Sequence, residues 1–176
     1  MRTDILTHSG HYFNYTDLAS NVVTIEDIAH GLSNVCRFAG HSPEFYSVAQ
    51  HSVLVSYLVP PEDALAGLMH DATEAYLGDM PTPLKRLMPA YRELEDRLHE
   101  DIFRRFNLNP VLPPSVKQAD LIALGGEKRD FFPRDCEPWF VLQGVAECPY
   151  TLEAWIPLRA KLNFLKRFEE LTCKHS

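Results

Sequence analysis

The chain has 176 residues, of which 45% are hydrophobic and 23% are charged, fractions typical of one globular domain with its own core. Its formal net charge of −7 disfavours binding to duplex nucleic acid, whose phosphates it would repel. No apolar run approaches the roughly 18 residues of a membrane span, and no signal sequence opens the chain. We therefore expect a cytoplasmic protein without a membrane partner.

The cysteines also favour a reducing compartment. They are widely spaced and contain no Cys-x-x-Cys pair, so neither a zinc ribbon nor a redox pair is indicated. Reduced thiols are expected at all of them: Cys36, Cys136, Cys148 and Cys173.

The N-terminal part should be an extended lead-in followed by a helix. Residues 1–23 mix small polar and aromatic side chains without a helical period, which predicts an irregular segment or a small hairpin. Thr24 offers a hydroxyl N-cap, with Glu26 and Asp27 in the first turn. A first helix should begin there and end near Cys36.

A second helix should carry His51. The segment 37–43 contains Gly and Pro, and apolar residues then recur at helical spacing from Phe45 to Tyr57. Pro60 ends this helix.

A third helix is predicted over residues 62–77, with Gly78 placed to end it. Prolines at 81 and 83 then predict a non-helical link. The apolar positions that define this third helix are Leu65, Leu68, Met69, Ala72 and Tyr76.

The second half of the chain continues the helical pattern. Apolar residues recur every four positions from Leu94 to Phe106, and another helical stretch covers residues 115–124. Residues 131–150 contain three prolines and should be irregular, whereas residues 151–173 should contain a C-terminal amphipathic helix. No alternation capable of building a sheet is present, so the predicted class is all-α, as a single domain over residues 1–176.

Metal-seeking and proton-handling side chains gather at one point of the third helix. His70 and Asp71 can both reach a cation above the helix surface, and Glu74 lies one turn along on the same face. A His-Asp pair alone is weak evidence, because such neighbours arise often by chance.

Two further residues strengthen the metal prediction. His51 precedes His70 by nineteen residues, and antiparallel helices joined through Pro60 can bring the two imidazoles together. Asp120 lies in an otherwise apolar helical segment, where a metal would compensate the burial of its charge. With Asp71 they give two imidazoles and two carboxylates, a set suited to Zn, Mn, Fe or Co, with Mg as a further option, and less suited to Ca.

The order His, then His-Asp, then Asp along a helical bundle resembles the HD-domain metal-dependent phosphohydrolases. The resemblance covers residues 24–130, the metal-site core, and its most specific phrase runs from His70 to Lys85. Within that family the chain looks most like bacterial 5′-deoxynucleotidases and the small phage enzymes that hydrolyse dATP to deoxyadenosine and triphosphate. The matching segments are residues 47–52, 68–74, 78–85 and 116–120.

The resemblance implies an HD-domain helical bundle and a role for each residue of its motif. Glu74 would be the acid or base that handles water, and Asp79 would lie near the nucleoside sugar or the attacking water. The metal ligands would be His51, His70, Asp71 and Asp120.

The same resemblance indicates where substrate would bind. Arg37 matches the family's phosphate-binding arginine, and Phe38 stands where a tryptophan commonly packs against base or sugar. His41 and Lys85 are further candidates for phosphate contact. The chain departs from the pattern at Phe38 and at Gln50, which replaces a glutamate.

Several of these residues also have ordinary structural interpretations. Glu74 could be a common helix carboxylate, and Asp79 could end the turn before Pro81. Arg37 and Lys85 could be solvated charges, and His41 could be a loop histidine without a role.

The expected function is hydrolysis of a deoxynucleotide phosphate at a divalent metal, with a small-molecule nucleotide as substrate and a homo-oligomer as the assembly. Two alternatives stay open. Another nucleotide, such as an alarmone or a cyclic dinucleotide, could be hydrolysed by the same chemistry. The protein could also be a nucleotide-sensing module that keeps the ligands without turnover.

Overall fold

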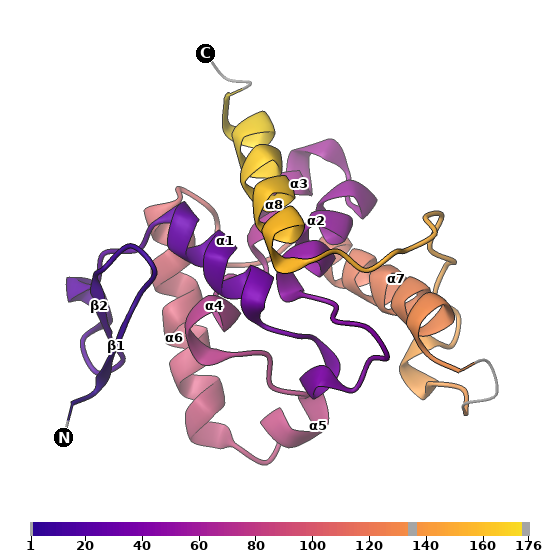
Figure 1. Cartoon of the computed structure of the whole chain (residues 1–176), viewed down its shortest axis with the longest axis horizontal. Helices are drawn as coiled ribbons and strands as arrows, with labels where there is room; N and C mark the ends of the chain where they lie inside the picture. The colour runs from indigo at the N-terminus through magenta and orange to yellow at the C-terminus, as the bar shows by residue number, and fades with distance from the viewer. Residues whose placement is uncertain (1, 134–136, 174–176) are drawn as a thin grey trace.

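A computed structural model describes residues 2–133 and 137–173, and helices dominate it (Figure 1). The predicted helical class is confirmed, and the lead-in contains the hairpin offered as one of its two forms. The elements used below are β1 (Asp4–Leu6), β2 (Tyr12–Asn14), α1 (Ile25–Asn34), α2 (Val48–Leu58), α3 (Ala64–Met69), α4 (Glu74–Leu77), α5 (Thr82–Lys85), α6 (Pro89–Arg105), α7 (Pro114–Phe131) and α8 (Pro157–Thr172).

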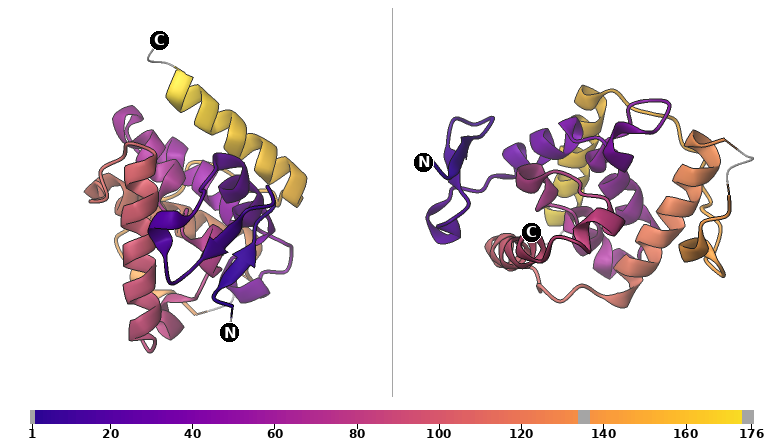
Figure 2. Two further views of the ribbon diagram at one scale, coloured as in Figure 1. Left: turned by 90° about the vertical axis from the view of Figure 1, so that its left-hand side faces the viewer. Right: turned by 90° about the horizontal axis from the view of Figure 1, so that it is seen from below.

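Helix α2 is the centre of the bundle, since it packs against α1, α3, α7 and α8. The hairpin lies at one end of the molecule and α7 at the other, as both Figure 1 and the right-hand view of Figure 2 show. Helix α8 returns from the end of the chain to cover α1 and α2. Segments that carry candidate ligands on α2 and α7 are therefore brought side by side.

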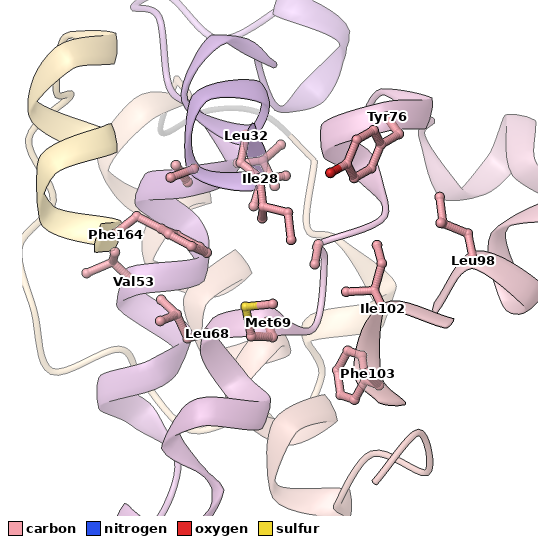
Figure 3. Close-up of a cluster of buried hydrophobic side chains, with 14 of the residues drawn as sticks. Ile28, Leu32, Val53, Leu68, Met69, Tyr76, Leu98, Ile102, Phe103 and Phe164 are labelled. Carbon is pink, nitrogen blue, oxygen red and sulfur yellow. The ribbon is translucent and has the colours of Figure 1, made fainter. Parts of the chain in front are cut away.

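The main core joins the beginning, middle and end of the chain. In Figure 3, Met69 lies between Phe164 of α8 and Ile102 of α6, and each of these side chains is fully buried. Their burial excludes water from the base of the segment that follows Met69, and it holds that segment in place. Further members of this cluster are Ile28, Leu32, Val53, Leu68, Tyr76, Leu98 and Phe103.

The hairpin is tied to α1 through Asp27. Its carboxylate accepts hydrogen bonds from the Ser9 backbone N–H (2.8 Å) and the Ser9 hydroxyl (2.5 Å). Burial alone would raise the pKa of Asp27, but the Ser9 hydrogen bonds outweigh it and lower that pKa. Thr24 caps α1 by accepting the Asp27 backbone N–H, as the sequence predicted.

Helix α2 begins three residues later than predicted. The apolar spacing suggested Phe45, but Ser47 is the N-cap and accepts the backbone N–H of Gln50. A capping hydroxyl thus overrides the apolar period at this end.

Other helix boundaries also differ from the prediction. Helix α7 extends to Phe131 instead of ending near residue 124, and α8 begins at Pro157 instead of residue 151. Helix α5 occupies the link predicted to be non-helical, because Pro83 falls in its first turn, where a missing N–H does no harm.

The predicted helix over residues 62–77 is broken at the His-Asp motif, so that prediction was wrong. A 3₁₀ turn over Pro61–Asp63 precedes α3, and residues 70–73 form a turn between α3 and α4. Hydrogen bonds within this turn span three residues, as from the Glu74 N–H to the Asp71 carbonyl (3.0 Å). In such a tightened turn, side chains three residues apart point in nearly the same direction. The Glu74 side chain is therefore aligned with that of Asp71 and less well aligned with that of His70.

Helices α1 and α4 approach closely at Gly31. A Cβ atom on Gly31 would lie 2.7 Å from the Ala75 carbonyl oxygen and 2.9 Å from the Ala75 Cα. Both are backbone atoms that a side chain could not push aside, so only glycine fits this contact.

Across residues 2–133 and 137–173, no helix combines the length and apolarity that crossing a membrane would require. Within the same ranges Cys36, Cys148 and Cys173 form no disulfide, whereas Cys136 lies outside the described residues.

Candidate metal centre

Four predicted ligands converge between α2, α7 and the turn that follows α3. One ligand atom from each of His51, His70 and Asp120 lies within 4.8 Å of the others. Asp71 joins them, because its Oδ2 lies 3.2 Å from His70 Nε2 and 3.7 Å from His51 Nε2. Asp120 Oδ1 lies 3.3 Å from His51 Nε2, so the carboxylates and imidazoles face a common centre.

Both imidazoles are held by their other nitrogen. His51 Nδ1 lies 2.6 Å from Glu127 Oε1, and His70 Nδ1 lies 2.8 Å from the Gly67 carbonyl oxygen, to which it donates. A histidine fixed through Nδ1 presents Nε2 to a metal, which is the usual arrangement around metal-binding histidines.

The donor set fits a divalent cation. His51 Nε2 and His70 Nε2 are buried and have no hydrogen-bond partner within the described part of the chain. Buried polar atoms are rarely left unpaired, and a cation between these nitrogens and Asp120 would give both of them a partner. His51, His70 and Asp120 thus offer two nitrogen donors and one oxygen donor close enough together to hold one ion, with Asp71 beside them.

The electrostatics favour positive charge at this point. Burial and Arg37 would lower the pKa of His51, but Glu127 and Asp120 raise it to about 9. Burial would raise the pKa of Asp71 and Asp120, yet the neighbouring imidazoles hold both values below their usual range. The carboxylates that favour a protonated His51 would favour a metal cation for the same reason.

Arg37 stands beside the cluster. Backbone pairing between Cys36 and Ser47 ties the end of α1 to the start of α2, which carries His51. Arg37 Nη1 lies 3.8 Å from Asp71 Oδ2, and Nη2 donates to Glu127 Oε2 at 3.1 Å. Its Nε is buried without a partner among the described residues, and the side chain as a whole is 11% exposed.

Glu74 and Asp79 form an acidic edge next to the ligands. Burial, then the charges of Asp71 and Asp79, raise the pKa of Glu74 well above its usual value. Burial also raises the pKa of Asp79, although Arg37 opposes it. Glu74 is buried with Oε2 unpartnered, so it can hold a proton at that oxygen.

The remaining predicted contacts lie further out. Lys85 donates to Glu95 at 2.7 Å and is therefore engaged by α6, although its charge is felt at Glu74. His41 is exposed in the loop after Gly40, and no described contact links its side chain to the ligands. The structure brings together Arg37, Glu74, Asp79 and the four ligands, but it does not bring His41 to them.

Phe38 belongs to an aromatic cluster that the sequence did not reveal. Its ring contacts Phe132 edge-on at 4.9 Å and lies 6.1 Å from Trp139, while the Arg37 guanidinium lies 5.3 Å from it. Phe38 and Ala39 both adopt positive φ values (57° and 51°), a strained conformation for residues other than glycine. That backbone conformation carries the Phe38 ring toward the two later aromatics.

Glu127 is the principal site residue that sequence reasoning missed. It is fully buried and contacts both His51 and Arg37. Its signal was its spacing of seven residues from Asp120, which places both on one face of α7.

Gln50, where the sequence departs from the family pattern, has a structural role here. Its amide donates to the Glu153 carbonyl (2.7 Å) and accepts the Trp155 N–H (2.8 Å). It thereby fastens the segment before α8 to α2, adjacent to His51.

Fold and site together define a helical protein with a buried His/carboxylate cluster able to hold a metal ion. The chain is 47% identical over 169 residues to "Uncharacterized protein YfdR" of Escherichia coli, covering 96% of this chain and 95% of that protein. It therefore belongs to the YfdR family. It is also 42% identical over 121 residues to "Uncharacterized protein RCAP_rcc00048" of Rhodobacter capsulatus, covering 63% of this chain and 62% of that protein. No family model matches the chain.

Proposed function

We propose that the protein is an HD-type, metal-dependent phosphohydrolase that acts on deoxynucleotides. The observation that carries this proposal is the convergence of two buried, unpartnered Nε2 atoms with two carboxylates, beside the partly exposed guanidinium of Arg37. The metal would be held by His51, His70, Asp71 and Asp120.

A divalent ion held there would lower the pKa of water and polarise a phosphoryl oxygen. Arg37 would supply the anion contact, because its planar guanidinium matches phosphate oxygens and its partly exposed side chain lies beside Asp71. Glu74 supplies a proton-carrying carboxyl group beside Asp71, and Asp79 lies on the same edge, where it would meet the sugar or the water.

The aromatic cluster supports a nucleotide as substrate. Phe38 lies next to Arg37 and contacts Phe132, which in turn contacts Trp139. All three rings are half-buried, so they would offer surface for a base or sugar. Lys128 Nζ lies 5.5 Å from the Trp139 ring centroid and adds positive charge there. Without His41, phosphate binding falls chiefly to Arg37.

The test is product analysis with defined metals. Protein freed of metal and resupplied with Mn, Co, Zn, Fe or Mg should release phosphate or triphosphate from deoxynucleoside mono- or triphosphates. The His70→Ala variant should be inactive, whereas His11→Ala, on the exposed hairpin, should match the wild type. Absence of release from every nucleotide with every metal would rule the proposal out.

The same panel decides between the alternatives when alarmones and cyclic dinucleotides are included. Turnover of those compounds alone would change the substrate class but not the chemistry. Tight nucleotide binding without any product would identify a sensing module. Sedimentation of the purified protein tests the accompanying proposal of a homo-oligomer.

A further inference from the structure

Glu127 contacts the candidate metal centre and the candidate phosphate site with one oxygen each. Oε1 lies 2.6 Å from His51 Nδ1, and Oε2 accepts from Arg37 Nη2 at 3.1 Å. The side chain is completely buried in α7. Glu127 thus joins the second imidazole nitrogen of a candidate metal ligand to the arginine, on the side of His51 away from the centre.

A buried carboxylate is tolerated only when its charge is compensated. Glu127 is fully buried, and its two oxygens are compensated by Arg37 Nη2 at 3.1 Å and by His51 Nδ1 at 2.6 Å. Losing either partner would leave that charge partly unpaired. The position of each partner therefore depends on the other through Glu127.

We propose that Glu127 is a positioning residue that couples the metal centre to the anion site, by orienting His51 for the metal and Arg37 for the substrate phosphate. The coupling rests on the proposed function, since it requires a metal at His51. It is also reciprocal: if a bound metal changes the anion affinity by some factor, a bound anion changes the metal affinity by the same factor.

The substitution Glu127→Gln separates the orientation of His51 from the orientation of Arg37. A carboxylate accepts from both partners at once, whereas an amide has one accepting oxygen and one donating nitrogen. In Glu127→Gln, either His51 or Arg37 therefore faces a donor instead of an acceptor. The substitution preserves volume, so it changes orientation and charge with little effect on packing.

The experiment measures cobalt binding by calorimetry and by the Co(II) absorption spectrum, with folding checked by circular dichroism. Glu127→Gln should weaken cobalt binding roughly 10- to 100-fold, as loss of a partner behind a metal-bound histidine typically does. It should also weaken the binding of sulfate, used as a tetrahedral anion. The matched control is Asp130→Asn, since Asp130 lies three residues further along α7 and pairs with Arg129 and the Leu152 N–H instead.

A double-mutant cycle with Arg37→Gln isolates the coupling. Arg37→Gln should change cobalt affinity in the wild-type background by a larger factor than in the Glu127→Gln background. Equal factors would show that Arg37 acts on the metal directly and would overturn the coupling.

The outcomes separate this inference from the proposed function. If the wild type binds none of the metals, the proposed function fails. If the wild type binds cobalt and folded Glu127→Gln binds it equally well, only the role of Glu127 fails. Should Glu127→Gln not fold, Glu127→Asp takes its place: its shorter arm keeps the charge but cannot span both partners, and unchanged cobalt and sulfate affinities would overturn the inference.

Discussion

Glu74 is distinguished from the metal-facing carboxylates by its surroundings. Burial and the nearby Asp71 and Asp79 charges raise its pKa, whereas the imidazoles lower the pKa of Asp71 and Asp120. Carboxylates whose environments push their pKa values apart usually serve different roles. Under the proposed function, Glu74 would therefore handle the proton and the other two would bind the metal.

Glu74→Gln should retain the metal and lose turnover by roughly 10²- to 10⁴-fold, the usual contribution of an acid or base. His70→Ala should lose both metal and turnover. Metal content and product release, measured on the same preparations, check these outcomes. Normal turnover in Glu74→Gln would assign proton handling to another group.

Arg37→Ala should raise KM for deoxynucleotides, because it removes a contact made to the phosphate before the reaction begins. Steady-state kinetics on a metal-loaded sample give KM and kcat separately. Arg129→Ala is the comparison, since Arg129 pairs with Asp130 and with the Cys148 and Tyr150 carbonyls. An unchanged KM in Arg37→Ala would make that arginine purely structural.

Trp139 offers a direct optical test of the aromatic cluster. The chain has two tryptophans, so Trp155→Phe leaves Trp139 as the sole reporter. Its fluorescence should change on adding a deoxynucleoside monophosphate but not on adding sulfate, because only the nucleotide brings a ring to Phe38 and Phe132. An identical response to both would place the base elsewhere.

At the residue scale, sequence spacing predicted candidate ligands, of which the fold brings His51, His70 and Asp120 within reach of one ion, but it did not predict the groups that hold them. His51, His70, Asp71 and Asp120 stand in an order that suggests a shared ion. The Gly67 carbonyl that holds His70 and the Glu127 carboxylate that holds His51 follow from how helices pack, which spacing alone does not determine.

At the scale of elements, the helices were predicted well where apolar periodicity and caps agreed. For α1, the Thr24 cap and the apolar periodicity predicted the same start of the helix. For α2, the Ser47 cap sets a later start than the apolar periodicity predicted. The turn over residues 70–73 contains no proline or glycine, so no local sequence signal predicted the break in the helix. Its tightened hydrogen bonds are set by tertiary packing around Met69.

At the same scale, Gln50 forms a clasp, meaning the two hydrogen bonds of its side chain that join α2 to the segment leading to α8. Gln50→Ala should destabilise the fold by about 1–3 kcal/mol, because two backbone groups lose their partner. Urea unfolding measures the change. Gln118→Ala, on an exposed position of α7, should shift stability by less than about 0.5 kcal/mol; equal effects would show that the clasp contributes nothing.

For the whole molecule, stability at acid pH depends partly on Asp27. Its pKa is lowered in the folded state, so its contribution is present above the ordinary value of 3.8 and is lost as pH falls through the lowered value. Asp27→Asn should reduce Tm at neutral pH, with a smaller difference from the wild type near pH 3. Thermal scans across this range, with Asp17→Asn as an exposed control, check it; a constant difference would contradict it.

The helical class of the whole molecule could be predicted because nearly every segment carried a helical period. How the helices pack could not, since contacts such as those of α8 with α1 and α2 join residues more than 100 positions apart. The formal net charge of −7 predicted only that duplex nucleic acid would be repelled. The anionic substrate of the proposed function would have to be attracted locally, by Arg37 and a bound cation.

The close approach of Gly31 to Ala75 makes position 31 informative about natural variation. Any relative that carries a larger residue there has had to move the start of α4, and with it Glu74 and the preceding His-Asp turn. Retention of glycine at this remote position, together with the ligands, would mark relatives whose centre keeps the same geometry. A bulky residue would mark relatives that keep the ligands but in which the distance between Glu74 and those ligands has changed.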